Sequence, residues 1–351
     1  MCLSPFWPPK EGSSLPQLPL EDSLPQTKPH DVPVNRGVVR NVMTVDVEDY
    51  FHAEAMSRAV PRESWNCMPL RVQQNTERIF DLFASRGVRG TFFFLGWVAE
   101  RFPALVQKAV RLGHEIGCHS YWHRPVSRLT QSEFREDTAR AKGVIEDAGG
   151  VAVRGYRAPS FSLVRGTEWA AQTLVDLGFQ YDSSVHPIRH DIYGNHSAPR
   201  RPFKVAGGRL LEIPIATARI AGNNLPFAGG GYFRAMPYSY VRWGLRRFSR
   251  TEGSPAVFYI HPWEIDLSQP RISTGLRSTF RQYIGLSTTW RKLERLCKEF
   301  SFVPISEAFH CELDGNSLES ERHETEVDSQ HPRRGGVRPT KPSVEAVGGG
   351  R

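Results

Sequence analysis

Short apolar runs alternate with longer amphipathic segments through the middle of the chain. In residues 72–85, for example, Val72, Ile79 and Phe83 recur at a spacing that places them on one face of a helix. The short runs between such segments are bounded by turn residues and are typical of buried strands. Strands that alternate with helices predict βα units and a mainly parallel sheet.

The pattern repeats seven or eight times. Expected strands cover residues 38–47, 90–95, 115–119, 153–157, 180–183, 210–216, 256–261 and 302–305. Expected helices cover residues 72–85, 103–112, 130–148, 168–177, 238–250 and 288–300. The third helix begins with a capping box, Thr130 and Glu133, and ends at Gly149-Gly150. This many repeats predicts an α/β fold with a closed or nearly closed barrel.

The two ends of the chain differ from the middle. Prolines recur among polar residues in 1–37, and residues 313–351 are charged and rich in Gly and Pro. Neither segment can bury enough apolar surface to fold alone. We therefore predict a Pro-rich disordered extension (1–37), one barrel domain (38–312) and a disordered charged tail (313–351). An upstream start codon is an alternative origin of the extension.

Composition narrows the class of protein. The 351 residues are 39% hydrophobic and 23% charged, as in ordinary globular enzymes, and the net charge is +8. Arginines are scattered and no nucleic-acid motif occurs, so we expect a solvated surface and no nucleic acid partner. Five cysteines without a CxxC pair argue against a disulfide framework. Without a secretory apolar region or an 18-residue apolar run, we expect no membrane span and a cytoplasmic protein.

Metal-ligating residue types follow two of the expected strands. Asp46, Glu48 and Asp49 close the first apolar run, and His119 and His123 follow the third. In an α/β barrel the carboxyl ends of the strands meet at one face, where active sites lie. Two imidazoles and one carboxylate would hold a divalent ion and leave a position open for water. This pattern indicates metal-assisted hydrolysis.

The choice of carboxylate stays open. Alternation along a strand puts Glu48 on the same side as Asp46, whereas Asp49 reaches the site only if the chain turns there. Two more polar motifs follow expected strands, Arg157-Ala158-Pro159-Ser160-Phe161 and His261-Pro262-Trp263-Glu264. Each motif alone has an ordinary structural explanation. Their joint placement after successive strands favours one functional site.

Together these motifs resemble the polysaccharide deacetylase family (NodB homology domain, carbohydrate esterase family 4). Val-Asp-Val-Glu-Asp-Tyr-Phe and Ile-His-Pro-Trp-Glu are similar to the subgroup found at exosortase and exopolysaccharide loci. The resemblance covers residues 42–304 and implies a distorted (β/α)7–8 barrel of the polysaccharide deacetylase type. It also implies a metal-dependent hydrolase that removes N-acetyl groups from an amino-sugar-containing polysaccharide or its oligosaccharide precursor. The expected cofactor is one divalent metal, zinc first, with cobalt or nickel as alternatives.

The resemblance assigns roles to individual residues. Asp46 would be the general base and Arg157 its ion-pair partner. His261 would be the general acid, oriented by Asp182, while backbone N–H groups near Ser160 would stabilise an oxyanion. The metal would be held by His119 and His123 together with Glu48 or Asp49, since Val47 occupies the position of the family's second aspartate. The alternative is that, with valine at this position, the metal is bound weakly or is absent.

Aromatic residues and loops are candidates for substrate contacts. Phe161, Tyr232 and Trp263 could form walls for a carbohydrate, with Trp263 favoured for stacking and Phe161 equally suited to core packing. The loops 186–208 and 221–234 interrupt the βα rhythm, and Gly229-Gly230-Gly231 would act as a flexible hinge for a closing loop. Two other functions stay open: a metal-independent hydrolase of cyclic amides, such as allantoin, and a non-catalytic carbohydrate-binding relic.

Overall fold

The computed structural model describes residues 40–190 and 193–314 of the 351-residue chain. The predicted extension 1–37 lies outside the described residues, as does nearly all of the predicted tail 313–351. Within the described part of the chain, no helix combines the length and apolar character needed to cross a membrane.

A nine-stranded sheet occupies the centre of the fold, with strand order β10-β1-β2-β3-β4-β5-β7-β6 and β11 added beside β1. Every pairing of strands within this sheet is parallel except that of β6 with β7. The strands are β1 (Asn41–Val47), β2 (Thr91–Phe94), β3 (Glu115–Cys118), β4 (Gly155–Tyr156), β5 (Tyr181–Asp182), β6 (Phe203–Val205), β7 (Leu210–Glu212), β10 (Val257–Ile260) and β11 (Phe302–Val303). The predicted α/β fold with a mainly parallel sheet is confirmed.

The sheet curls without forming a continuous ring of paired strands. The chain leaves β7 and approaches β10, where the Ala216 N–H donates to the Val257 carbonyl oxygen at 3.1 Å. This bond joins the two ends of the curl, but no ladder does so among the described residues. Instead, the chain between these ends forms a separate hairpin of β8 (Thr217–Ile220) and β9 (Asn223–Pro226). The barrel is therefore open on this side.

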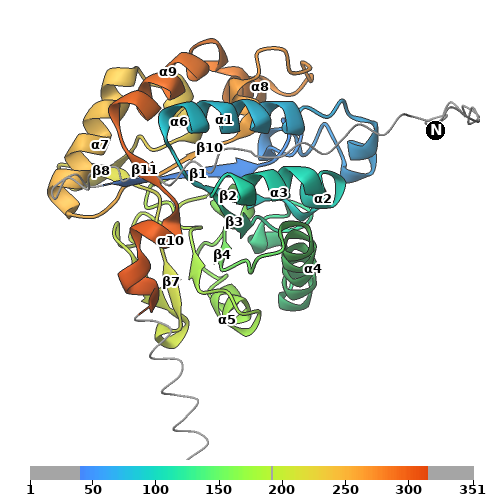
Figure 1. The fold of residues 1–351 in the computed structure, drawn as a ribbon, viewed down its shortest axis with the longest axis horizontal. Coiled ribbons are helices and arrows are strands. Elements are labelled where there is room, and N and C mark those ends of the chain that lie inside the picture. Colours follow the sequence, from blue (N-terminus) through green and yellow to red (C-terminus); the bar gives the residue numbers. More distant parts are fainter. Residues whose placement is uncertain (1–39, 191–192, 315–351) are drawn as a thin grey trace, which may run out of the picture.

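Helices form an outer layer around the curled sheet (Figure 1). They are α1 (Val72–Arg86), α2 (Gly96–Arg101), α3 (Pro103–Arg111), α4 (Gln131–Gly149), α5 (Trp169–Asp176), α6 (Gly230–Ala235), α7 (Tyr238–Glu252), α8 (Leu276–Tyr283), α9 (Leu286–Glu299) and α10 (Ile305–Ala308). All six predicted helices form within about two residues of the expected bounds, and the capping box of Thr130 and Glu133 is present. The sequence patterns missed α2, α6, α8 and α10, which are short.

The triple glycine is a packed element and not a hinge. Gly229 has φ of 125° and bridges to Tyr259 of β10, and a Cβ there would lie 2.0 Å from the Tyr259 carbonyl oxygen. A Cβ on Gly230 would lie 2.2 Å from the Tyr259 hydroxyl, whereas a Cβ on Gly231 within α6 would make only an ordinary contact, 3.7 Å from Arg234 Nη2. The prediction of a flexible Gly229–Gly231 hinge is wrong, because two of these glycines permit close contact with β10.

This packing predicts opposite effects for two neighbouring substitutions. Gly229→Ala should lower the free energy of unfolding by about 3 kcal/mol, because it adds a backbone clash to a left-handed φ. Gly231→Ala, the matched control, should raise it by about 0.5 kcal/mol by restricting the unfolded chain. Urea denaturation followed by circular dichroism measures both values. Equal, small effects would mean that the segment is a loose loop after all.

Candidate active site

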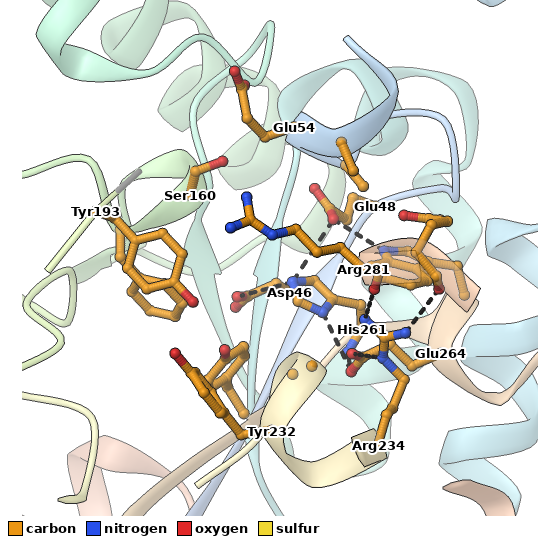
Figure 2. A pocket seen from close by; sticks show the side chains of 18 of the residues that line it. Asp46, Glu48, Glu54, Ser160, Tyr193, Tyr232, Arg234, His261, Glu264 and Arg281 are labelled. Atoms are coloured by element: carbon orange, nitrogen blue, oxygen red, sulfur yellow. Dashed lines mark hydrogen bonds and ion pairs between the residues drawn. The ribbon is translucent and has the colours of Figure 1, made fainter. Parts of the chain in front are cut away.

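A cavity of about 380 Å³ opens where β1, β3, β4 and β10 end. Figure 2 shows side chains from the ends of β1, β4 and β10 and from α6 and α8 around this cavity. The predicted site residues on its wall are Asp46, Glu48, His119, His123, Ser160, Phe161, Tyr232, His261 and Trp263. The structure thus brings together residues that lie more than 200 positions apart in the sequence.

Glu48, His119 and His123 form a potential metal-binding group, with one ligand atom from each lying within 4.8 Å of the others. His119 Nδ1 is 2.8 Å from the Arg157 carbonyl oxygen, so Nδ1 carries the hydrogen and Nε2 is left to coordinate. Burial lowers the pKa of His119 to about 4, which keeps its imidazole neutral. His123 Nε2 lies 2.6 Å from Glu48 Oε2. Two buried imidazoles and one carboxylate fit a zinc-type ion.

The charges of this group are set by its own members and by the neighbouring His261. Burial alone would raise the pKa of Glu48, but the nearby His123, His261 and His119 more than offset it and the net pKa is lowered. Burial likewise lowers the pKa of His123, and Glu48 reverses the direction so that it is raised. The carboxylate is therefore ionised at neutral pH, as a metal ligand must be.

Backbone strain is concentrated around the cavity. Ser120, His123, Ser160 and Phe161 are four of the six non-glycine residues with positive φ in the described part of the chain. Such conformations cost roughly 1–3 kcal/mol each and need support from their surroundings. Asp137 of α4 supports the histidine turn by accepting the backbone N–H groups of residues 121 and 122 at 2.7 and 3.2 Å.

Asp49 is not part of the metal group. Its Oδ2 accepts the backbone N–H groups of Arg71 and Val72 at 2.7 and 2.9 Å, and its Oδ1 accepts that of Tyr50. Asp49 thereby satisfies donors at the beginning of α1, which α1 itself leaves unpaired. The chain does turn after β1, but it directs Asp49 to a helix and leaves Glu48 at the cavity. Of the two open candidates, the geometry favours Glu48.

Asp46 and Arg157 form a buried ion pair beside the metal group. Arg157 NH1 donates to Asp46 Oδ1 at 2.8 Å and to Thr44 Oγ1 at 2.6 Å. Its Nε and NH2 donate to the carbonyl and hydroxyl oxygens of Ser183, both at 2.9 Å. Asp46 Oδ2 lies 3.8 Å from His261 Nε2. This geometry agrees with the expected pairing of base and arginine.

His261 is held by Glu264 and not by Asp182. Glu264 Oε2 accepts the His261 backbone N–H at 3.0 Å and lies 3.3 Å from His261 Nδ1, while Glu264 Oε1 accepts from Arg234 Nε at 2.7 Å. Burial lowers the pKa of His261, but the anions Glu264, Glu48 and Asp46 raise it to about 9. Arg234 was not predicted from the sequence. Glu264 belongs to the motif that begins at His261, and the three-residue spacing of these two residues is that of a capping box, which is a signal for their contact.

Asp182 is engaged elsewhere in the sheet. It accepts a hydrogen bond from the Ser184 hydroxyl at 2.5 Å and interacts with Glu212 of β7. Burial raises the pKa of Asp182, and burial together with the nearby Asp182 raises the pKa of Glu212. The assignment of Asp182 as the residue that orients His261 is therefore wrong, because Asp182 is committed to a partner on the adjacent strand.

Trp263 also has a different role from the expected one. It is only 4% exposed, its Nε1–H donates to Glu48 Oε1 at 3.1 Å, and its ring stacks on His261 with centroids 5.2 Å apart. An indole used in this way orients the carboxylate of the potential metal-binding group and offers little free face to a sugar. Phe161 is 6% exposed and packs against Tyr259, which agrees with core packing, one of the two roles expected for it. Tyr232 and Tyr193, which was not predicted, line the cavity on the side away from Glu264 (Figure 2).

Two family models match the chain. Residues 64–181 match the polysaccharide deacetylase family, and residues 183–310 match a domain of unknown function, DUF3473. The first segment contains the two histidines and Arg157, and the second contains Arg234, His261 and Glu264. Asp46 and Glu48 precede both matched segments.

Curated relatives match parts of the chain. A peptidoglycan-N-acetylglucosamine deacetylase of Bacillus cereus is 30% identical over 128 residues, 34% of this chain and 46% of the relative. A peptidoglycan deacetylase of Helicobacter pylori is 30% identical over 31% of this chain and 36% of its own. A chitooligosaccharide deacetylase of Bradyrhizobium is 31% identical over 24% of this chain and 39% of its own. The chain thus spans less than half the length of these relatives.

A solved structure of a peptidoglycan deacetylase from Bacillus subtilis is 14% identical, with a TM-score of 0.41 over 84% of this chain and 99% of that one. A family 4 carbohydrate esterase from Streptomyces lividans is also 14% identical, with a TM-score of 0.39 over 74% of this chain and 89% of that one. Residues 64–181 are therefore similar to the polysaccharide deacetylase family, both through the family model and through the curated relatives.

Proposed function

We propose that this protein is a metal-dependent hydrolase that removes N-acetyl groups from amino-sugar-containing saccharides. The observation that carries the proposal is the arrangement around one cavity of a metal-binding group, the Asp46–Arg157 pair and the Glu264-supported His261. The deacetylase activities named for the curated relatives support the same reaction class.

Glu48, His119 and His123 would hold a divalent ion, with zinc favoured by this ligand set. When bound, such an ion supplies Lewis acidity toward a water molecule and an acetamide carbonyl. Asp46 would take a proton from the attacking water, because Arg157 holds one of its oxygens and leaves the other facing His261 and the cavity. At the strained turn of Ser160 the N–H groups of Phe161 and Ser162 already donate to the Ala158 and Pro159 carbonyl oxygens, so the Ser160 N–H would donate to the developing oxyanion.

His261 would deliver a proton to the leaving nitrogen. Its raised pKa of about 9 means that it is protonated at neutral pH, and Glu264 fixes its ring through contacts to Nδ1 and to the backbone. Arg234 in turn fixes Glu264 and is itself buried, with further bonds to the carbonyl oxygens of Gln282 and Ile284. The products are acetate and a free amino sugar.

The substrate assigned to this chain is an exopolysaccharide or its oligosaccharide precursor, acted on in the cytoplasm. The two sequences Val-Asp-Val-Glu-Asp-Tyr-Phe and Ile-His-Pro-Trp-Glu support this choice through their resemblance to the exopolysaccharide-locus subgroup. A cavity wall that includes Tyr193 and Tyr232 is suited to a sugar ring. Acetate release from N-acetylated chitooligosaccharides by the zinc-loaded protein tests the activity, and no release from any acetamido sugar tried would count against it.

The metal assignment predicts a clear difference between two adjacent carboxylates. Glu48→Gln should weaken zinc binding by more than the roughly 100-fold that loss of an outer-shell partner causes, because it removes a ligand. Asp49→Asn should retain zinc and lower the free energy of unfolding by about 1–2 kcal/mol, because it disturbs the cap of α1. Zinc affinity by competition with a chelator, together with urea denaturation, distinguishes them. The reverse pattern would identify Asp49 as the ligand.

The contact between Trp263 and Glu48 predicts a role in metal affinity. Trp263→Phe should weaken zinc binding about 10- to 100-fold, because Glu48 loses the donor that fixes its carboxylate. Trp65→Phe is the matched control, since Trp65 is equally buried but its Nε1 has no hydrogen-bond partner among the residues that the structure describes. Isothermal titration with zinc should show a change only for the first variant. Equal losses of zinc affinity in the two variants would show that the effect comes from aromatic packing and not from the hydrogen bond to Glu48.

The contacts of His261 predict different effects for substitutions of Glu264 and Asp182. Glu264→Gln should lower kcat for acetate release about 100-fold or more with zinc content unchanged, because His261 loses the carboxylate that orients it. Asp182→Asn should leave kcat unchanged, because Asp182 does not contact His261. If Asp182→Asn abolishes turnover in a protein that is still folded and zinc-loaded, the role deduced from the sequence resemblance holds instead.

A further inference from the structure

The most exposed large apolar side chains of the described residues lie in one short segment. Leu267, Leu276 and Phe280 are 62%, 92% and 64% exposed, whereas other exposed large apolar residues, such as Val151 at 43%, lie well below these values. Leu276 and Phe280 are four positions apart in α8 and so share one helix face. Exposure of this extent costs hydration free energy in an isolated protein, so a partner that covers this face is expected.

The same segment is strongly cationic. From Leu267 to Leu293 the sequence contains no Asp or Glu, while Arg271, Arg277 and Arg281 flank the exposed apolar positions. Basic side chains beside exposed Leu and Phe on an amphipathic helix are the pattern of an interface with anionic lipid.

The segment is firmly attached to the active site. Arg234 NH1 donates to the Gln282 carbonyl oxygen at 2.7 Å, and Gln282 Nε2 donates to the Tyr50 carbonyl oxygen at 3.2 Å. Arg271 stacks over the Tyr283 ring at 4.3 Å, which ties the preceding loop to the end of α8. The exposed face therefore belongs to an ordered helix with a fixed position.

This face also borders the cavity. Phe280 and Arg281 line its wall, and Figure 2 shows Arg281 above the site between Glu54 and His261. A surface that covered Leu276 and Phe280 would therefore lie next to the entrance of the cavity.

We propose that α8 and the loop before it, residues 267–281, form a docking surface for an anionic phospholipid bilayer. Leu267, Leu276 and Phe280 insert among the acyl chains near the headgroups, and Arg271 and Arg277 contact the phosphates. Docking places the cavity entrance at the membrane surface, where it meets saccharides that are carried on lipid. The binding step itself does not depend on the proposed deacetylation.

Co-sedimentation of the full chain with vesicles tests the proposal. Phosphatidylcholine vesicles that contain phosphatidylglycerol should bind the protein, and phosphatidylcholine vesicles alone should bind it much more weakly. The double variant Leu276→Ser/Phe280→Ser should lose about tenfold or more in affinity. Arg271→Gln and Arg277→Gln should each lose about fivefold on the anionic vesicles, and added salt should reduce the difference.

Val151→Ser is the matched control, because Val151 is an exposed apolar residue in a different part of the fold and should not affect binding. Since all of these side chains are exposed, the variants should keep the wild-type circular dichroism spectrum and zinc affinity. Absence of binding to anionic vesicles would overturn the proposal, as would equal losses in the control. Concentration-dependent dimerisation that depends on Leu276 and Phe280, without vesicle binding, would assign the face to a second copy of the chain.

Discussion

The buried guanidinium of Arg157 is the constraint on which the site depends. A charge with no exposed surface is tolerated only when it is paired and fully hydrogen-bonded, and loss of one partner costs roughly 3–5 kcal/mol. Arg157 meets this demand with Asp46 and Thr44 of β1 and with Ser183 after β5, while its carbonyl oxygen fixes the tautomer of His119 after β3. The same bonds that satisfy one buried cation therefore set the relative positions of Asp46, the proposed base, and His119, a proposed metal ligand.

The fold and the approximate place of the site could be predicted because both follow from local patterns. Helices such as α4 begin at a capping box and end at glycine, and metal-ligating residues after apolar runs indicate strand ends. The partners of individual side chains could not be predicted in this way. Asp182 and Glu264 are both acids near the site, and only the register of β5 with β7 shows that Asp182 faces Glu212.

Two further errors have the same origin. Trp263 was expected to stack on sugar because it follows His261, but burial against Glu48 commits both its ring and its N–H. Gly229-Gly230-Gly231 was expected to be flexible because glycine permits many conformations. In the folded chain that freedom is used to bring α6 against β10, and the reason is visible only from the position of Tyr259. The type of a residue limits the conformations and contacts that it can adopt, whereas its tertiary neighbours decide which of them it does adopt.

The division of the site between two matched segments gives the second segment a chemical role. Residues 64–181 carry His119, His123 and Arg157 but no oriented acid. The carboxylate proposed to complete the metal-binding group is that of Glu48, which precedes this segment. Residues 183–310 supply His261, Glu264 and Arg234, and their Trp263 holds the carboxylate of Glu48. The longer side chain of glutamate needs such an external donor to fix it, since it has one more rotatable bond than aspartate. The C-terminal segment is thus part of the active site and, through α8, part of the cavity entrance.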